Sequence, residues 1–231
     1  MSEKYRLIVD TETANGLAFP LPYDFSYRIV RGKDLREVVS RQFIVREIFL
    51  DSDLMNTAYY VEKVPEYWRR IWNKDARLVT MYEARRAFLE DCAEYGVKEL
   101  YAYNMTFDYR ALNNLMRHCT SEKYRYFFPK RFKVCCIWNM AADAFLATRK
   151  YYEFAVANGW LSEKGNILTN AECAYNFITG DVTFSELHIG IDDVAIETEI
   201  LRYCLTRHKK MDKTPKGGIW QKCQKYNRAV A

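Results

Sequence analysis

The sequence predicts an α/β fold: a mixed sheet of three antiparallel strands followed by parallel strands, flanked by helices. Three observations lead to this prediction. Strand-like apolar runs fill the first fifty residues, helical apolar stripes begin only after Val64, and from there strand-like and helix-like segments alternate. With 231 residues, 49% of them hydrophobic, the chain can bury a sizeable core and suits one domain with an insertion or a tail.

The first part of the chain predicts an antiparallel meander. An apolar, β-branched-rich run from Leu7 to Val9 indicates a buried strand. The segments Tyr23–Val30 and Val38–Leu50 predict the next two strands, and Gly32-Lys33-Asp34 between them is a turn signal. Strands joined by so short a turn pair antiparallel.

The middle of the chain alternates between helix and strand. Pro65–Trp72 is a short helix candidate, and Thr80–Glu94 has a longer helical stripe that Gly96 closes. Glu99–Tyr103 and Lys133–Trp138 are strand-like and are separated by a further helical stripe. This order predicts strands added to the meander through helical connections.

The region from Tyr151 to Leu187 is longer than a plain connection requires. It contains a predicted hairpin around Gly159–Ile167. Thr169 with Glu172 three residues later predicts a helix that opens on a capping box. The last helix is expected to begin near Asp193.

Positive charge is concentrated at the C-terminal end. Residues 207–231 contain eight Lys or Arg and one Asp, a balance of +7, so residues 1–206 hold −2 of the total of +5. We therefore divide the chain into a domain over 1–206, with the extended segment about 151–187, and a basic tail over 207–231. Such a tail can bind a polyanion through counterion release or can be a solvated terminus, and both readings stay open.

Composition also excludes several classes of protein. The seven cysteines form no Cys-x-x-Cys pair, which argues against a zinc site and favours reduced thiols in a cytoplasmic compartment. The N-terminus enters the first strand almost at once, so we expect no signal peptide. No apolar run is long enough to cross a bilayer, so we expect no membrane partner.

Two acids mark the end of the first strand. Asp10 and Glu12 are two residues apart, and side chains at that spacing leave a strand on the same side. Carboxylates held so close repel each other unless a cation lies between them, and Mg²⁺ takes oxygen ligands of this kind. Two solvated surface acids would produce the same short pattern.

Two later segments contain candidate functional residues near the start of a predicted helix. Asp108 follows a strand in Asn104-x-x-Phe107-Asp108, near the start of a helix, where a carboxylate can also serve as an ordinary cap. His188 is followed after four residues by Asp193, at the start of the last helix. A loop histidine there can lie at the mouth of an acidic site, or it can be an ordinary loop residue.

Together these segments resemble the DEDDh 3′–5′ exonucleases, the DnaQ-like branch of the ribonuclease-H-like fold. The matching motifs are Val9-Asp10-Thr11-Glu12-Thr13, then Asn104-x-x-Phe107-Asp108, then His188 with Asp193. The motifs occur in the family's order, and the resemblance covers nearly all of residues 5–206. It implies a ribonuclease-H-like fold and a metal-dependent exonuclease that releases nucleoside 5′-monophosphates from single-stranded 3′ ends.

The resemblance also implies roles for single residues. Asp10 would bind both of two Mg²⁺ ions, which Mn²⁺ could replace, Glu12 and Asp193 would hold the first ion, and Asp108 would reach the second. His188 would be the general base. Candidate substrate contacts are Thr11, Thr13, Ala14, Asn104 and Phe107, of which Phe107 also suits the core.

The substrate is left open between related classes. DNA 3′ ends are favoured, with a replication or repair protein as a candidate partner, and RNA or short oligonucleotides are the alternative. A nucleic-acid-binding module of the same fold with little turnover is a further alternative, although no member of the acid set is missing.

Overall fold

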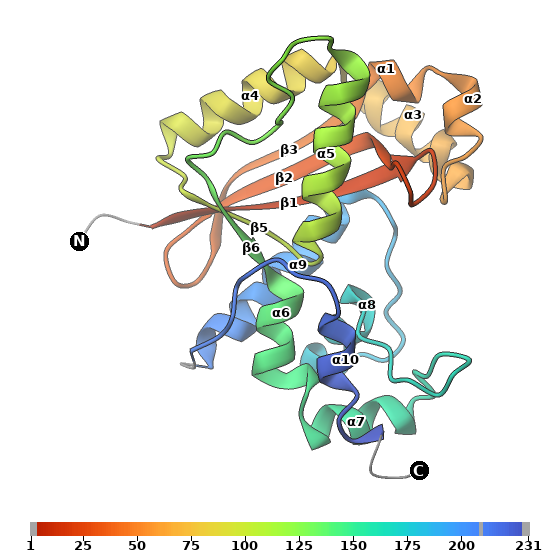
Figure 1. Cartoon of the computed structure of the whole chain (residues 1–231), viewed down its shortest axis with the longest axis vertical. Helices are drawn as coiled ribbons and strands as arrows, with labels where there is room; N and C mark the ends of the chain where they lie inside the picture. Colours follow the sequence, from red (N-terminus) through yellow and green to blue (C-terminus); the bar gives the residue numbers. More distant parts are fainter. Residues whose placement is uncertain (1–3, 208–209, 228–231) are drawn as a thin grey trace.

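A six-stranded mixed sheet forms the centre of the molecule (Figure 1). The structure is a computed structural model and describes residues 4–207 and 210–227. The strand order is β4-β3-β2-β1-β5-β6, where β1 pairs antiparallel with β2, β2 antiparallel with β3, and the remaining pairs are parallel. The strands are β1 (Tyr5–Ala14), β2 (Leu21–Arg31), β3 (Arg36–Val45), β4 (Arg77–Val79), β5 (Glu99–Ala102) and β6 (Lys133–Cys136). The predicted fold class, three antiparallel strands followed by parallel strands, is confirmed.

Helices cover both faces of this sheet and extend below it in Figure 1. Helix α5 crosses the sheet on the side facing the viewer, α9 passes behind, and α6, α7, α8 and α10 gather below. The helical elements are α1 (Arg46–Phe49), α2 (Ser52–Met55), η1 (Val61–Lys63), α3 (Val64–Asn73), α4 (Met81–Glu94), α5 (Met105–Cys119), α6 (Ile137–Ala141), the π-helical turn η2 (Ala142–Leu146), α7 (Arg149–Ala157), α8 (Ala171–Thr179), α9 (Gly190–Thr206) and α10 (Ile219–Cys223). Within the described residues, no helix is both long and apolar enough to cross a membrane.

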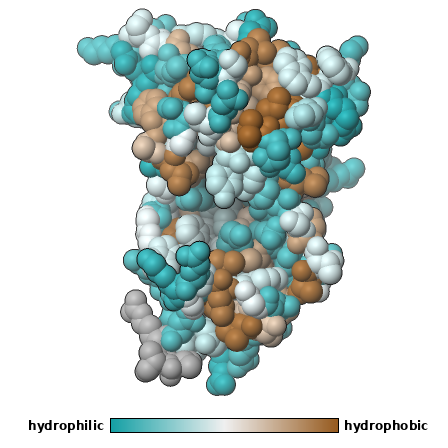
Figure 2. Space-filling view, turned by 90° about the vertical axis from the view of Figure 1, so that its right-hand side faces the viewer, coloured by the Kyte–Doolittle hydropathy of each residue, from teal (hydrophilic) through white to brown (hydrophobic). Residues whose placement is uncertain are grey.

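The surface reflects this division into an upper and a lower part. On the face seen in Figure 2, the molecule is hollowed about halfway along its length, between the part that holds the sheet and the helices below it. Hydrophilic and hydrophobic residues are interspersed on both sides of the hollow.

The third strand ends earlier than predicted. It stops at Val45, and the residues up to Phe49 are helical, so the expected strand to Leu50 is wrong in its last part. Ile48 and Phe49 are adjacent and both buried. Because successive strand residues point to opposite faces, a helical turn lets both pack toward one core. The three-residue strand β4 was not predicted, because so short a segment shows no alternation of hydrophobic and polar residues.

Helix starts follow local capping chemistry. At α4 the predicted start is confirmed, because Thr80 and Glu83 form a complete capping box. At α8 the predicted capping box is wrong. The N-cap is Asn170, whose side chain accepts the Cys173 N–H at 3.0 Å, while the Glu172 carboxylate accepts hydrogen bonds from Ser185 and Glu186. The hairpin predicted around Gly159–Ile167 contains a single antiparallel bridge among the described residues.

The described part of the segment after Arg207, residues 210–227, packs on the domain at several points. The Cys136 N–H donates to the Lys213 carbonyl at 2.8 Å, so this segment covers the exposed edge of β6. The Gln224 side chain bonds both the N–H and the carbonyl of Ile167, at 2.9 and 3.0 Å. Ile219 is buried as well. The expected basic tail is thus a packed strap over 210–227, and its residues 208–209 and 228–231 lie outside the described residues.

Candidate metal centre

Strand β1 supplies two acids from the middle of the sheet. Asp10 lies opposite Ser26 and Glu12 opposite Asp24 in the antiparallel register with β2, and the register shifts just after Glu12. Leu7, Ile8 and Val9 are fully buried, and side chains two residues apart leave a strand on the same face. Asp10 therefore projects from the same side as Glu12, and its buried Oδ2 atom has no hydrogen-bond partner within the described part of the chain.

Helix α5 brings in the third acid. The N-cap of this helix is Asn104, and Asp108 lies in the first turn. Asp108 is therefore not the helix cap that the sequence also allowed. Its Oδ1 accepts a hydrogen bond from the Thr11 hydroxyl at 2.9 Å, in a buried position. Thr11, which lies between Asp10 and Glu12 on β1, thus orients the Asp108 carboxylate.

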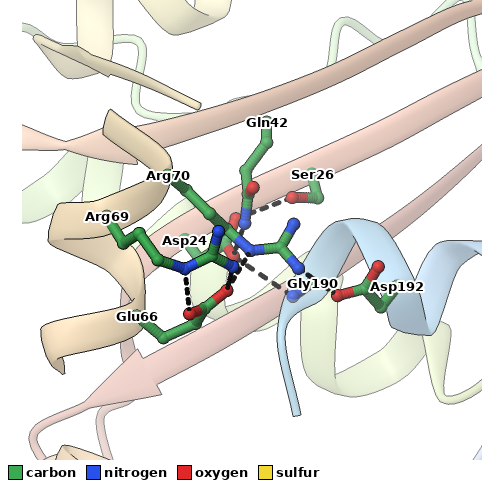
Figure 3. A network of polar contacts seen from close by, with 8 residues as sticks. All are labelled: Asp24, Ser26, Gln42, Glu66, Arg69, Arg70, Gly190 and Asp192. Atoms are coloured by element: carbon green, nitrogen blue, oxygen red, sulfur yellow. Dashed lines mark hydrogen bonds and ion pairs between the residues drawn. The ribbon is translucent and has the colours of Figure 1, made fainter. Parts of the chain in front are cut away.

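Helix α9 brings in the fourth acid through a close approach to β2. Gly190 is the first residue of the helix, and its N–H donates to Asp24 Oδ2 at 3.2 Å (Figure 3). A Cβ atom at Gly190 would lie 3.0 Å from Ser26 Oγ, so only glycine fits without displacement. This contact sets the N-terminus of α9 beside the strands, with Asp193 in its first turn.

A polar network anchors this junction (Figure 3). Asp24 is fully buried and accepts hydrogen bonds from Ser26 Oγ and Gln42 Nε2, both at 2.7 Å. Arg70 of α3 forms an ion pair with Asp192, with 2.6 Å between Nη2 and Oδ2. Asp192, although adjacent to Asp193, therefore ties α9 to α3.

Several of these groups could hold a metal ion together. Glu12, His188 and Asp193 each offer one ligand atom, and the three atoms lie within 4.8 Å of one another. Asp10 Oδ2 and Asp193 Oδ1 are buried and have no hydrogen-bond partner in residues 4–207 and 210–227. Carboxylate oxygens are the ligands that hard divalent cations prefer. Unpartnered buried oxygens beside such a cluster fit a divalent cation.

Burial raises the pKa of every acid in this cluster, and neighbouring carboxylates raise it further for Asp10, Glu12 and Asp193. Burial first, and then the charges of Glu197 and Asp108, raise the pKa of Asp10 well above its usual range. Burial raises the pKa of Asp108 and of Asp193 to about 7 in each case. Burial likewise raises the pKa of Glu12. Without a cation the cluster retains protons near neutral pH, and a bound cation would favour its ionised form.

His188 lies at the partly exposed margin of the cluster. Its backbone has a positive φ of 52°, and its imidazole stacks on the Tyr60 ring with 4.0 Å between ring centres. Nδ1 is 3.9 Å from a carboxylate oxygen of Glu186. Burial lowers the pKa of His188, so the ring stays neutral at neutral pH and can accept a proton.

Sequence reasoning missed three acids at this site. Asp24 is buried opposite Glu12 on β2, Glu186 precedes His188, and Glu197 follows Asp193 by one helical turn. Burial raises the pKa of Glu186 to about 8. The four-residue spacing from Asp193 to Glu197, which puts two side chains on one helix face, was the available signal for Glu197. Asp24 carries no such signal, because its position depends on strand register.

The predicted substrate contacts differ in exposure. Thr11 and Ala14 are buried, and the Thr11 hydroxyl is engaged by Asp108. Asn104 is exposed and Thr13 and Phe107 are half-buried, so these three present surface at the edge of the site.

Comparison with known proteins rests on structure. No family model matches the sequence, and no curated protein matches it. The nuclease domain of 3′hExo, a DEDDh family member bound to rAMP, superposes with a TM-score of 0.58 at 12% identity, covering 91% of this chain and 97% of that one. A 3′-exonuclease that recognises the histone mRNA stem-loop superposes with a TM-score of 0.61 at 13% identity, covering 93% and 69%.

A bacterial nuclease gives a similar result. E. coli Exonuclease I in complex with a dA16 oligonucleotide has a TM-score of 0.57 at 12% identity, and the match covers 89% of this chain but 41% of that one. The architecture is thus common to solved nucleases with a range of chain lengths. The chain has the fold of DEDDh family nuclease domains, a ribonuclease-H-like mixed sheet with helices on its faces.

Proposed function

We propose that this protein is a DEDDh 3′–5′ exonuclease that hydrolyses single-stranded nucleic acid with the help of divalent metal ions. One observation carries the proposal: β1, α5 and α9 bring four acids to one site beside His188. Glu12, Asp193 and His188 offer ligand atoms within 4.8 Å of one another, and Thr11, between Asp10 and Glu12 on β1, bonds Asp108 at 2.9 Å. The fold around this cluster is that of nucleases.

The acids would hold the metal ions. Asp10 would be shared by two ions, Glu12 and Asp193 would hold one of them, and Asp108 would hold the other, oriented by Thr11. Two Mg²⁺, or Mn²⁺ in their place, would supply positive charge to the scissile phosphate and its transition state. The unpartnered oxygens of Asp10 and Asp193 within the described residues support this assignment.

His188 would be the general base. Its Nδ1 faces Glu186, so Nε2 is the atom left to take the proton from the attacking water. The water oxygen would bond to phosphorus, and the bond from phosphorus to the 3′ oxygen of the shortened strand would break. That oxygen would take up a proton from solvent, and the terminal nucleotide would leave as a nucleoside 5′-monophosphate. Stacking on Tyr60 would hold the ring in place.

The substrate class is single-stranded nucleic acid, with DNA proposed first. E. coli Exonuclease I is known in complex with a DNA oligonucleotide, whereas another similar nuclease recognises an RNA stem-loop. RNA 3′ ends are therefore the second candidate. The seven free thiols support a cytoplasmic, reducing location as part of the same proposal.

The test uses 5′-labelled single-stranded DNA and RNA of equal sequence, each with Mg²⁺, Mn²⁺ or EDTA. The wild type and Asp10→Asn are compared, with Asp75→Asn, an exposed aspartate, as the matched control. We expect metal-dependent shortening by the wild type and the control, none by Asp10→Asn, and faster shortening of DNA. Equal activity of Asp10→Asn would contradict the site, and binding of either strand without hydrolysis would favour a binding module.

A further inference from the structure

Glu197 is a buried acid that the proposed mechanism has not used. It lies on α9, one turn after Asp193, and only 4% of its surface is exposed. Its Oε2 atom is buried and has no hydrogen-bond partner among the described residues. A buried carboxylate in this state is costly unless a cation or a proton compensates its charge.

The surroundings of Glu197 point toward the cluster. Among charged side chains, Glu197 raises the pKa of Asp10 the most, and Asp108 raises the pKa of Glu197 the most. Asp193 and Glu186 also act on it. The charged groups that act most strongly on Glu197 are therefore acids of the site.

A purely structural role explains this side chain poorly. Glutamine has the same shape, could still accept a hydrogen bond from the Tyr103 backbone N–H that favours the Glu197 carboxylate, and would bring no charge into an acidic cluster. An ionised carboxylate in this place repels Asp10 and Asp108 unless a proton or a cation compensates its charge. A carboxylate at position 197 is explained if its negative charge binds a metal cation.

We propose that Glu197 is a fifth carboxylate of the metal centre and, with Asp10 and Asp108, holds the second metal ion directly or through a water molecule. This inference rests on the proposed function, because it assumes the two-metal site. A higher count of ligand charges tightens binding of divalent cations. The protein would therefore bind its second ion before nucleic acid arrives.

The experiment measures Mn²⁺ binding in the absence of nucleic acid, by calorimetry and by the electron paramagnetic resonance signal of free Mn²⁺. The wild type is compared with Glu197→Gln, Glu197→Asp and Glu199→Gln. Glu199 is the matched control, because it lies on the same helix and pairs with Arg202, outside the cluster. Thermal unfolding in EDTA verifies that each variant is folded.

We expect Glu197→Gln to weaken binding of one ion by roughly tenfold or more, as loss of a metal-site partner does. Glu197→Asp should weaken it less, and should still report on the charge if the Gln variant does not fold. Glu199→Gln should bind as the wild type does. Metal-free stability should not fall in Glu197→Gln.

Two results would overturn the inference in different ways. Unchanged Mn²⁺ affinity in a folded Glu197→Gln variant, beside a wild type that binds Mn²⁺, would remove Glu197 from the centre and leave the proposed function intact. A wild type that binds no Mn²⁺ would overturn the metal centre itself, and Glu197 with it.

Discussion

Replacing Asp108 with asparagine should stabilise the metal-free protein while it damages the proposed metal centre. The asparagine side chain would still offer an oxygen to the Thr11 hydroxyl, which now donates to Asp108 Oδ1 at 2.9 Å. The substitution therefore removes a buried charge without removing its hydrogen bond. Because burial raises the pKa of Asp108 to about 7, the ionised form is the unfavourable one in the folded protein.

The size of the effect follows from the pKa shift. A raised carboxyl pKa means that the folded state binds the Asp108 proton more tightly than the unfolded state does. The stabilisation that this proton provides is fully present below pH 3.8 and is lost as pH rises through about 7. At about 1.4 kcal/mol per pKa unit, the loss is at most roughly 2 kcal/mol at pH 5 and roughly 4 kcal/mol at pH 8. For a chain of this length, about 4 kcal/mol corresponds to roughly 8–16 °C in Tm.

The assay is thermal and urea unfolding in EDTA at pH 5 and pH 8. The wild type and Asp108→Asn are compared, with the exposed Asp75→Asn as control. The Tm advantage of Asp108→Asn should grow with pH, and saturating Mg²⁺ should reduce it by stabilising the wild type more. A variant that is equally or less stable than the wild type at pH 8 would refute the electrostatic reasoning.

Three further substitutions and the pH profile of kcat/KM test the account. His188→Ala should lower kcat by about 10²–10⁴-fold with only a small loss in Tm, since the side chain is partly exposed and loses only its stacking on Tyr60; unchanged kcat would remove it as the base. Burial lowers the pKa of His188, so the acid limb of kcat/KM should lie below pH 6.5, and a limb above that value would contradict the assignment. Gly190→Ala places a Cβ 3.1 Å from Asp24 Cγ. It should lower the free energy of unfolding in urea by about 1–3 kcal/mol and should also lower activity. Full activity would show that the close approach of Gly190 to β2 does not position Asp193. Ile219→Ala should cost about 2–5 kcal/mol by the same measurement, and a negligible cost would mean that the strap over 210–227 does not support the fold.

Local patterns predicted most of the fold. The run Leu7–Val9 is a buried strand, and the apolar stripe predicted over Thr80–Glu94 is a helix, because both patterns depend on residues close together in sequence. The end of β3 was misplaced because burial of Ile48 and Phe49 on one side overrides strand propensity. The packing of residues 210–227 was not predicted, because charge alone does not reveal contacts such as those of Gln224.

The candidate site was predictable where it consists of motifs. Asp10 and Glu12 were read from their spacing on a strand, whereas Asp108 and Asp193 were read from the resemblance to the DEDDh exonucleases. The fold brings these acids together. Asp24 could not be read, because its place opposite Glu12 depends on the register of two strands. The stacking of Tyr60 on His188 likewise joins the segment between α2 and η1 to the loop before α9, and no local pattern specifies it.

The most direct test of the central claim is the direction of hydrolysis. A 5′-labelled single strand is incubated with the wild type and Mg²⁺, beside the same strand with a blocked 3′ terminus and one with a blocked 5′ terminus, and the released products are identified. The account predicts a ladder that shortens from the 3′ end, nucleoside 5′-monophosphates as products, and inhibition by the 3′ block alone. Internal fragments, or degradation stopped only by the 5′ block, would contradict it.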